Sequence, residues 1–159
     1  ERVATQSSDI EQALWELEDH ALIYQGRTVP EPEYVFRHAL TQDAVYQTVV
    51  QHRRAEFHGS VAREMEALYA DDIDAHIEQL AYHYELSDDD GKAAEYLLRA
   101  GEKARRNYLN DEATAYLTKC LEMLEALPET EDTAQQRLDA NMSLGKLRHG
   151  AASPEEAER

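Results

Sequence analysis

The chain has 159 residues and a mass of 18.2 kDa, a length that suits one domain or a piece of a larger protein. Its 33 Asp and Glu outnumber its 16 Lys and Arg, and the net charge of −17 argues against a nucleic-acid or anionic-membrane surface. A single cysteine, Cys120, excludes a disulfide framework and a cysteine zinc site, and the apolar runs are too short for a membrane span or a signal peptide. We therefore expect a cytoplasmic protein.

The N-terminal residues predict a helix followed by one β-hairpin. Ser8 and Glu11 fit a capping box with Ser8 as the N-cap, and helical spacing of apolar residues continues to about His20. Turn-forming residues then separate two short β-prone runs, Ala21–Tyr24 and Tyr34–Phe36. This is the one convincing strand pair in the sequence.

From Ala39 onward the pattern is helical. Phe57, Val61, Met65 and Leu68 recur at helical spacing and predict the apolar stripe of an amphipathic helix. Caps are expected at Asp72 or Asp74, at Asp90 and at Asn110, with a last long helix from about Asp132 to Leu147 and a break at Gly150–Pro154. The helix after the first of these caps should bury Ile77, Leu80, Ala81 and Tyr84.

Small residues recur in the helical part at a spacing of twelve. The pairs are Ala81 and Ala93, Gly101 and Ala113, and Gly145 and Ala157, and Cys120 holds a further small-residue position. Antiparallel helices approach closely only where their facing side chains are small. The pattern resembles the skeleton of tetratricopeptide repeats (TPR), although its register departs from a regular array. Because Ala157 falls near the end of the sequence, we expect a fragment that stops within a repeat.

Charge is distributed unevenly along the chain. Tyr34–Arg63 has a net charge of +2 and Tyr96–Asn110 a net charge of +3, while the other stretches are acidic. Basic islands of this kind are either docking faces or ordinary solvated helix surface.

Several segments together resemble the middle part of bacterial STAND-type signalling ATPases. The segments, in order, are Tyr34–Tyr46, Arg54–His58, His76–Tyr84, Ala94–Gly101 and Asn110–Ala113. Their order is most similar to that of large proteins that join a class III adenylate cyclase domain, an ATPase and helical repeats. LuxR-type regulators carry a similar section.

The resemblance implies a mainly α fold in two parts. Residues 1–50 would be a partial winged helix, consisting of a helix, one β-hairpin and a helix. Residues 51–159 would be antiparallel helix pairs of a TPR-like α-solenoid, truncated within a repeat. The chain contains no phosphate-binding loop and no cyclase aspartate pair, so it is expected to hold no cofactor, although a longer parent could bind ADP or ATP.

The implied function is a non-catalytic regulatory scaffold that binds protein, either its own ATPase or effector domain or another partner. The alternatives are a stand-alone TPR-like peptide-binding module and the same module from a LuxR-type regulator. A DNA-reading helix is a poor interpretation, because the helix before the hairpin carries four acids and no Lys or Arg between Ile10 and His20. We expect no nucleic-acid or membrane partner and no enzymatic activity.

His38 is the sharpest candidate for a functional residue. It follows the second β-prone run and precedes a helix, where backbone amides favour an anion. In similar ATPases of apoptosis and plant immunity, a histidine at this junction contacts the β-phosphate of ADP, which implies a nucleotide-sensing role here. A capping or packing histidine is the alternative.

The other chemically interesting residues favour structural roles. His76 and His83 share a helical face but lack a third metal ligand, so no metal site is expected. Cys120 is expected to be a buried packing residue. The tyrosines are expected mostly at helix interfaces, with an aromatic peptide-binding groove as the alternative; they are Tyr82, Tyr84, Tyr96, Tyr108 and Tyr116.

Overall fold

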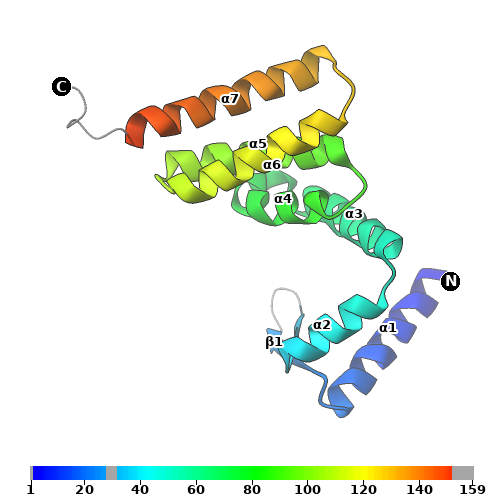
Figure 1. The fold of residues 1–159 in the computed structure, drawn as a ribbon. Coiled ribbons are helices and arrows are strands. Elements are labelled where there is room, and N and C mark those ends of the chain that lie inside the picture. The colour runs from blue at the N-terminus through cyan, green and yellow to red at the C-terminus, as the bar shows by residue number, and fades with distance from the viewer. Residues whose placement is uncertain (1, 28–31, 152–159) are drawn as a thin grey trace. The chain divides into compact units, whose positions relative to one another are not determined.

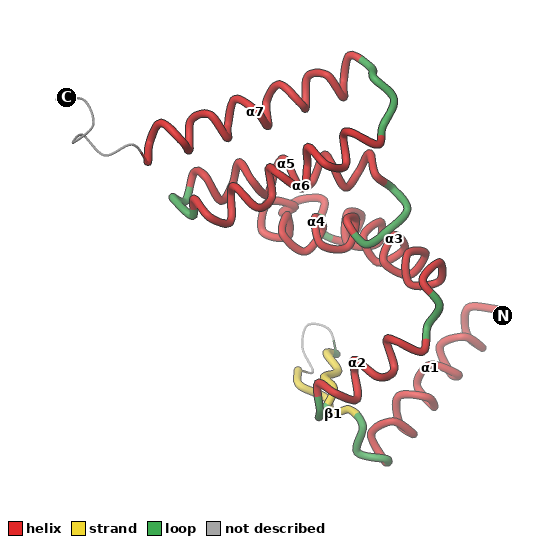
Figure 2. The backbone as a smooth tube through the Cα atoms, in the orientation of Figure 1, coloured by secondary structure: helices red, strands yellow, loops and turns green. Residues whose placement is uncertain are grey.

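The computed structural model describes residues 2–27 and 32–151, and within them the chain is mostly helical with a single two-stranded sheet. The prediction of a mainly α fold with one hairpin and antiparallel helix pairs is therefore confirmed. The chain divides into two compact units, Glu1–Val50 (unit 1) and Gln51–Arg159 (unit 2). Figure 1 gives the order of the elements along the chain, and Figure 2 separates helices, strands and loops.

Unit 1 consists of helix α1 (Arg2–Asp19), strands β1 (Ile23–Arg27) and β2 (Glu33–Phe36), and helix α2 (Ala39–Thr48). The strands are antiparallel, with Ile23 opposite Phe36, and the register shifts between Gln25 and Arg27. The predicted hairpin is present, but its first strand begins two residues later than expected. The reason is the end of α1, where Ala21 adopts a left-handed conformation with φ of 56° before the strand can start.

The core of unit 1 is small. Ile23, at 4% exposure, is the one buried apolar side chain among residues 9–27 and 32–50. Helix α2 has no buried residue, and Leu40 is 82% exposed. On α1 the single tryptophan, Trp15, is 64% exposed.

Unit 2 is a stack of helices. In chain order they are α3 (Gln51–Leu68), the 3-10 helix η1 (Ala70–His76), α4 (Ile77–Glu85), α5 (Asp90–Arg106), α6 (Asn110–Ala126) and α7 (Glu131–Ala151). Each α-helix of unit 2 packs against the next one in the chain, and α5 also contacts α7 (Figure 1). Helix α5 therefore lies at the centre of unit 2.

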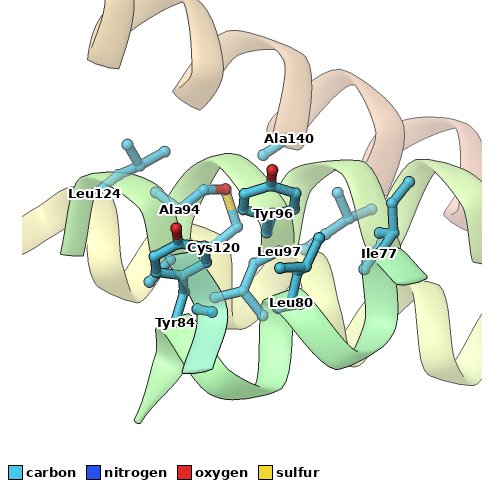
Figure 3. Packing of buried hydrophobic residues seen from close by; sticks show 14 residues of the cluster. Ile77, Leu80, Tyr84, Ala94, Tyr96, Leu97, Cys120, Leu124 and Ala140 are labelled. Atoms are coloured by element: carbon cyan, nitrogen blue, oxygen red, sulfur yellow. The ribbon is translucent and has the colours of Figure 1, made fainter. Parts of the chain in front are cut away.

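The core of unit 2 is continuous from α3 to α7. Helix α4 buries the four residues expected, Ile77, Leu80, Ala81 and Tyr84. Figure 3 shows Ile77, Leu80 and Tyr84 meeting side chains of α5 and α6, with Ala140 of α7 above them. Buried side chains on five helices, α3 to α7, therefore form one apolar cluster that fixes the helix pairs.

Small side chains lie where the helices approach most closely. Ala81, Ala93, Ala113 and Cys120 are at most 1% exposed, and Gly101 is buried as well. A Cβ added to Gly101 would lie 2.7 Å from Cγ of Leu117, so α5 and α6 are too close there for any side chain. Gly145 has open space around it, and Ala157 lies outside the described residues.

The prediction that α3 packs through its apolar stripe is wrong. Phe57, Val61 and Leu68 are 57%, 42% and 60% exposed, and of the stripe only Met65 packs against the core. The buried positions of α3 are instead Gly59 and Ala62. Because these residues are small, α4 can approach α3 on a side offset from the larger apolar residues.

Several predicted helix ends are also wrong. Helix α1 begins at Arg2, so Ser8 lies inside it, because no glycine or proline upstream stops the helix. The observed N-caps are His76, Asp89 and Leu109 in place of Asp72 or Asp74, Asp90 and Asn110. Helix α7 includes Gly150, which was expected to break it. Local capping patterns locate helix ends only to within a few residues.

Candidate functional site

His38 lies at the N-cap of α2, and its side chain is exposed. Its backbone is extended, with φ of −133° and ψ of 125°, and its carbonyl accepts hydrogen bonds from the amides of Thr41 and Gln42. The imidazole makes no capping hydrogen bond. The ring is therefore positioned at a helix N-terminus without serving as its cap.

The other histidines have separate partners. His76 stacks on the ring of Tyr69 and forms a hydrogen bond with the side chain of Gln79. Nδ1 of His83 lies 2.9 Å from Nδ1 of His58 on α3. Burial lowers the pKa of both rings of this pair, the Arg54 guanidinium lowers that of His58 further, and His58 does the same to His83. A neutral pair satisfies this contact, because one ring nitrogen can then donate to the other.

The described part of the chain shows no other obvious chemical centre. It contains no group of three or more His, Cys, Asp or Glu side chains arranged to hold a metal ion. None of its helices combines the length and apolarity that crossing a membrane requires. Cys120 is buried, its thiol lies 3.4 Å from the carbonyl of Ala94, and burial raises its pKa to about 11, which keeps it protonated.

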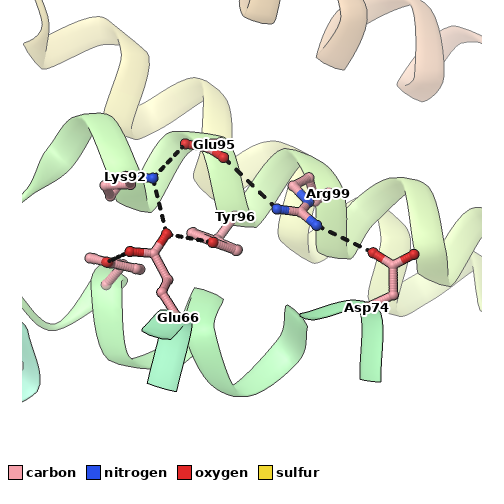
Figure 4. Close-up of polar contacts among 7 residues, drawn as sticks. Glu66, Asp74, Lys92, Glu95, Tyr96 and Arg99 are labelled. Carbon is pink, nitrogen blue, oxygen red and sulfur yellow. Dashed lines mark hydrogen bonds and ion pairs between the residues drawn. The ribbon is translucent and has the colours of Figure 1, made fainter. Parts of the chain in front are cut away.

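A polar network centred on Glu66 joins α3, α4 and α5. The Glu66 carboxylate accepts hydrogen bonds of 2.5 Å from the hydroxyls of Tyr84 and Tyr96 and one of 3.0 Å from Lys92 (Figure 4). The two tyrosine rings are stacked with their centroids 5.3 Å apart. The tyrosines thus place their rings in the core and their hydroxyls on a single carboxylate.

The network keeps Glu66 ionised. Burial alone would raise its pKa, but the hydrogen bonds from Tyr84, Tyr96 and Lys92 outweigh burial and hold the pKa below the ordinary value. Burial and the neighbouring carboxylate raise the pKa of Tyr96 to about 12 and that of Tyr84 further, so both tyrosines remain donors. The carboxylate therefore connects three helices at neutral pH.

The same polar face continues along α5 toward a groove. Arg99 lies over the ring of Tyr96, 5.0 Å from its centroid, and forms an ion pair of 3.2 Å with Asp74 (Figure 4). Lys103 pairs with Glu78 at 2.8 Å and donates to the carbonyl of Asp74. These contacts hold the segment of η1 that borders the groove against α5.

An open groove of about 460 Å³ lies along α5 and α7. Its lining residues are Leu98, Arg99, Glu102 and Arg106 on α5, Asp139, Met142, Ser143 and Lys146 on α7, and Asp74 and Ile77 beside them. Residues three and four positions apart lie on one helical face, so each helix presents a single face to the groove. The groove offers apolar contact and both signs of charge.

Two of the carboxylates in the groove have internal partners. Asp74 is paired with Arg99, and Glu102 accepts hydrogen bonds from Arg105 and from the hydroxyl of Ser143. Burial would raise the pKa of Glu102, but these two bonds and the Lys146 ammonium lower it. Glu102 is therefore an ionised group that fixes α7 to α5.

The sequence indicated only part of this site. Arg99 and Arg106 belong to the basic island Tyr96–Asn110, but Met142 and Lys146 carried no recognisable pattern. Glu66 was also missed, because one acid among many on a helix gives no sign that it faces inward. Among the tyrosines, Tyr84, Tyr96 and Tyr116 pack in or against the core, as expected for most of them. Tyr82 is 55% exposed but its ring contacts His58 of α3, whereas Tyr108 is 88% exposed and does not lie at a helix interface.

Comparison of the chain with protein-family models, with curated proteins and with solved structures finds no match. The resemblance to STAND-type ATPases therefore remains a hypothesis from the sequence segments alone. Function has to be argued from the geometry of the groove and from the core that supports it.

Proposed function

We propose that the chain is a non-catalytic protein-interaction scaffold and that the groove along α5 and α7 binds a segment of a partner protein. The observation that carries this proposal is the groove itself, which is open and has a volume of about 460 Å³. Its lining includes Met142, whose side chain is 49% exposed and lies among charged side chains. Exposed apolar side chains rimmed by polar ones are typical of protein-binding surfaces.

The walls of the groove are rigid, which favours binding. Helix α5 is fixed by buried Leu97 and by the hydrogen bonds of Glu66, and α7 by buried Ala140 and the bond from Ser143 to Glu102. A preformed groove loses little conformational freedom when a ligand binds, so more of the contact energy appears as affinity.

The resemblance suggests a setting for such a scaffold. In a bacterial multidomain signalling ATPase of the adenylate cyclase type, unit 1 would be the end of a winged helix and unit 2 a TPR-like region that relays the state of a partner or nucleotide. A stand-alone peptide-binding module and a LuxR-type regulator are the alternatives. The mainly helical fold with one hairpin is compatible with each of them.

His38 is proposed as the nucleotide-sensing residue of that setting. The supporting observation is that its exposed ring lies at the N-terminus of α2 and makes no capping hydrogen bond. Because the rest of the phosphate site would come from an ATPase core, this chain by itself should bind ADP and ATP only weakly. Calorimetry that gave micromolar affinity for this chain would contradict the assignment.

Selection of random displayed peptides on the intact chain tests the scaffold function. Peptides that bind should lose affinity for the variant Met142→Glu, which places a charge in the groove. Leu138→Glu is the matched control, because Leu138 is 53% exposed on the same helix but does not line the groove. Failure to select any peptide that distinguishes the two variants would contradict the proposal.

A further inference from the structure

We infer that the partner segment is acidic and carries an apolar side chain next to its carboxylates. The inference rests on the proposed function and specifies the chemistry of the ligand. It follows from the cations of the groove that form no direct ion pair among the described residues and from the apolar side chains that line the same groove.

The unsatisfied charges of the groove are mainly positive. Arg106 and Lys146 are exposed, and neither forms a direct ion pair with any residue in the described ranges, although the Lys146 ammonium acts on Glu102 through its charge. They project from α5 and α7, on the two sides of the groove. A carboxylate between them would gain charge-assisted hydrogen bonds from both helices.

The negative charges of the groove are mostly occupied. Asp74 forms an ion pair with Arg99, and Glu102 accepts hydrogen bonds from Arg105 and Ser143. Asp139 accepts a hydrogen bond from Gln135 and is the one lining carboxylate that has no cationic partner among the described residues. Among the described residues, the groove thus has two cations without a direct ion pair, Arg106 and Lys146, and one carboxylate without a cationic partner, Asp139. This balance favours an anion locally, although the whole chain carries a net charge of −17.

Apolar side chains line the same groove as the charged groups. Leu98 on α5, Met142 on α7 and the buried Ile77 line the same groove. Methionine adapts its shape to different apolar partners, so Met142 can accommodate one branched or aromatic side chain. The combination fits a short segment with acidic residues next to an apolar one, whereas a nucleic acid would meet the strongly acidic remainder of the chain.

The test uses defined peptides and the full chain. Fluorescence anisotropy would compare a labelled peptide of alternating Glu and Leu with peptides in which Gln or Lys replaces every Glu, and with single-stranded oligothymidylate. We expect saturable binding of the Glu peptide alone, weakened by salt because the contacts are ionic. Preferred binding of the Gln peptide, the Lys peptide or the oligonucleotide would overturn the inference.

Paired variants locate the binding. Arg106→Gln with Lys146→Gln should weaken binding of the Glu peptide by about tenfold or more, the loss expected when charge-assisted contacts are removed. Arg63→Gln with Arg148→Gln removes the same charge from exposed positions outside the groove and should change affinity by less than about twofold. Circular dichroism melts verify that all four substitutions leave the fold intact.

The outcomes separate this inference from the proposed function. Equal losses in the two paired variants would show a diffuse charge effect and overturn the inference. Selection of groove-dependent peptides that are neutral or basic would also overturn it while leaving the scaffold function standing. If no displayed peptide depends on the groove, the proposed function fails first.

Discussion

The two units of this chain bury their apolar residues to very different extents. In unit 2, Leu80, Leu97, Leu117 and Leu124 are fully buried in one cluster that spans the five helices α3 to α7. In the described part of unit 1, Ile23 is the one buried apolar side chain. The two units therefore differ in the quantity that stabilises a fold, the apolar surface removed from water.

The difference separates the roles of the two units. Unit 2 has enough core to hold α5 and α7 in place, which a binding groove requires. Unit 1 keeps its backbone hydrogen bonds but leaves residues such as Trp15 and Leu40 exposed, so we expect it to be the less stable unit.

The largest effect is expected from truncating a core leucine in unit 2. Leu117→Ala removes a fully buried side chain that lies against Gly101 and should lower the free energy of unfolding by about 2–5 kcal/mol. Leu22→Ala in unit 1 removes a side chain that is 37% exposed and should cost about 1 kcal/mol or less. Urea unfolding followed by far-UV circular dichroism measures the first, and fluorescence of Trp15 reports the second.

Equal losses for Leu117→Ala and Leu22→Ala would contradict the difference between the two cores.

The next largest loss of stability is expected from removing the charge of Glu66, the centre of the polar network in unit 2. Glu66→Gln replaces an ionised acceptor of two tyrosine hydroxyls and should lower the free energy of unfolding by about 1–3 kcal/mol at neutral pH. Because the folded pKa of Glu66 is lowered, its stabilisation is present above the ordinary value of 4.5 and is lost as the pH falls through the folded pKa. Urea unfolding between neutral and acidic pH should therefore show a steeper loss below that value for the parent than for the variant.

Lys92→Met is the control for the network. Lys92 is partly exposed, and the tyrosine hydroxyls would keep their acceptor, so the loss should be smaller, about 1 kcal/mol or less. A pH profile that Glu66→Gln leaves unchanged would show that Glu66 does not carry this dependence.

Replacing either of two helical glycines in unit 2 with alanine should change the stability in opposite directions. Gly101→Ala places a Cβ against Leu117 and should cost about 1–2 kcal/mol after the gain in helix propensity, whereas Gly145→Ala meets open space and should gain up to about 1 kcal/mol. Thermal melts of both variants measure the difference. In the Leu117→Ala background the loss from Gly101→Ala should disappear, and persistence of the loss would assign it to something other than this contact.

The smallest effect is expected at two helix ends, one in each unit. Tyr108 follows α5 with φ of 62°, and Ala21 follows α1 with φ of 56°, in turns where the next amide bonds back into the helix. Glycine is favoured at this position because it has no Cβ, so Tyr108→Gly and Ala21→Gly should each gain about 0.5–1 kcal/mol. Melting temperatures that fall in both variants would show that the side chains contribute more than the strain costs.

The sequence predicted the helices and the hairpin well because periodicity and turn residues are local properties. It identified the buried face of α4, from Ile77 to Tyr84, for the same reason. It misplaced the stripe of α3, since only the packing of α4 decides whether Phe57 or Ala62 faces inward. The groove could not be predicted, because Arg106 and Lys146 are forty residues apart and become neighbours only through the stacking of α5 and α7.

Hydrogen–deuterium exchange of the intact chain, resolved by peptide mass spectrometry, tests most directly whether the two units differ in stability. Amides of α5 between Ala94 and Ala104 should exchange slowest, while those of α1 and α2 should exchange at least about a hundredfold faster. Protection of α1 and α2 equal to that of α5 would contradict the claim that unit 2 alone carries a self-supporting core.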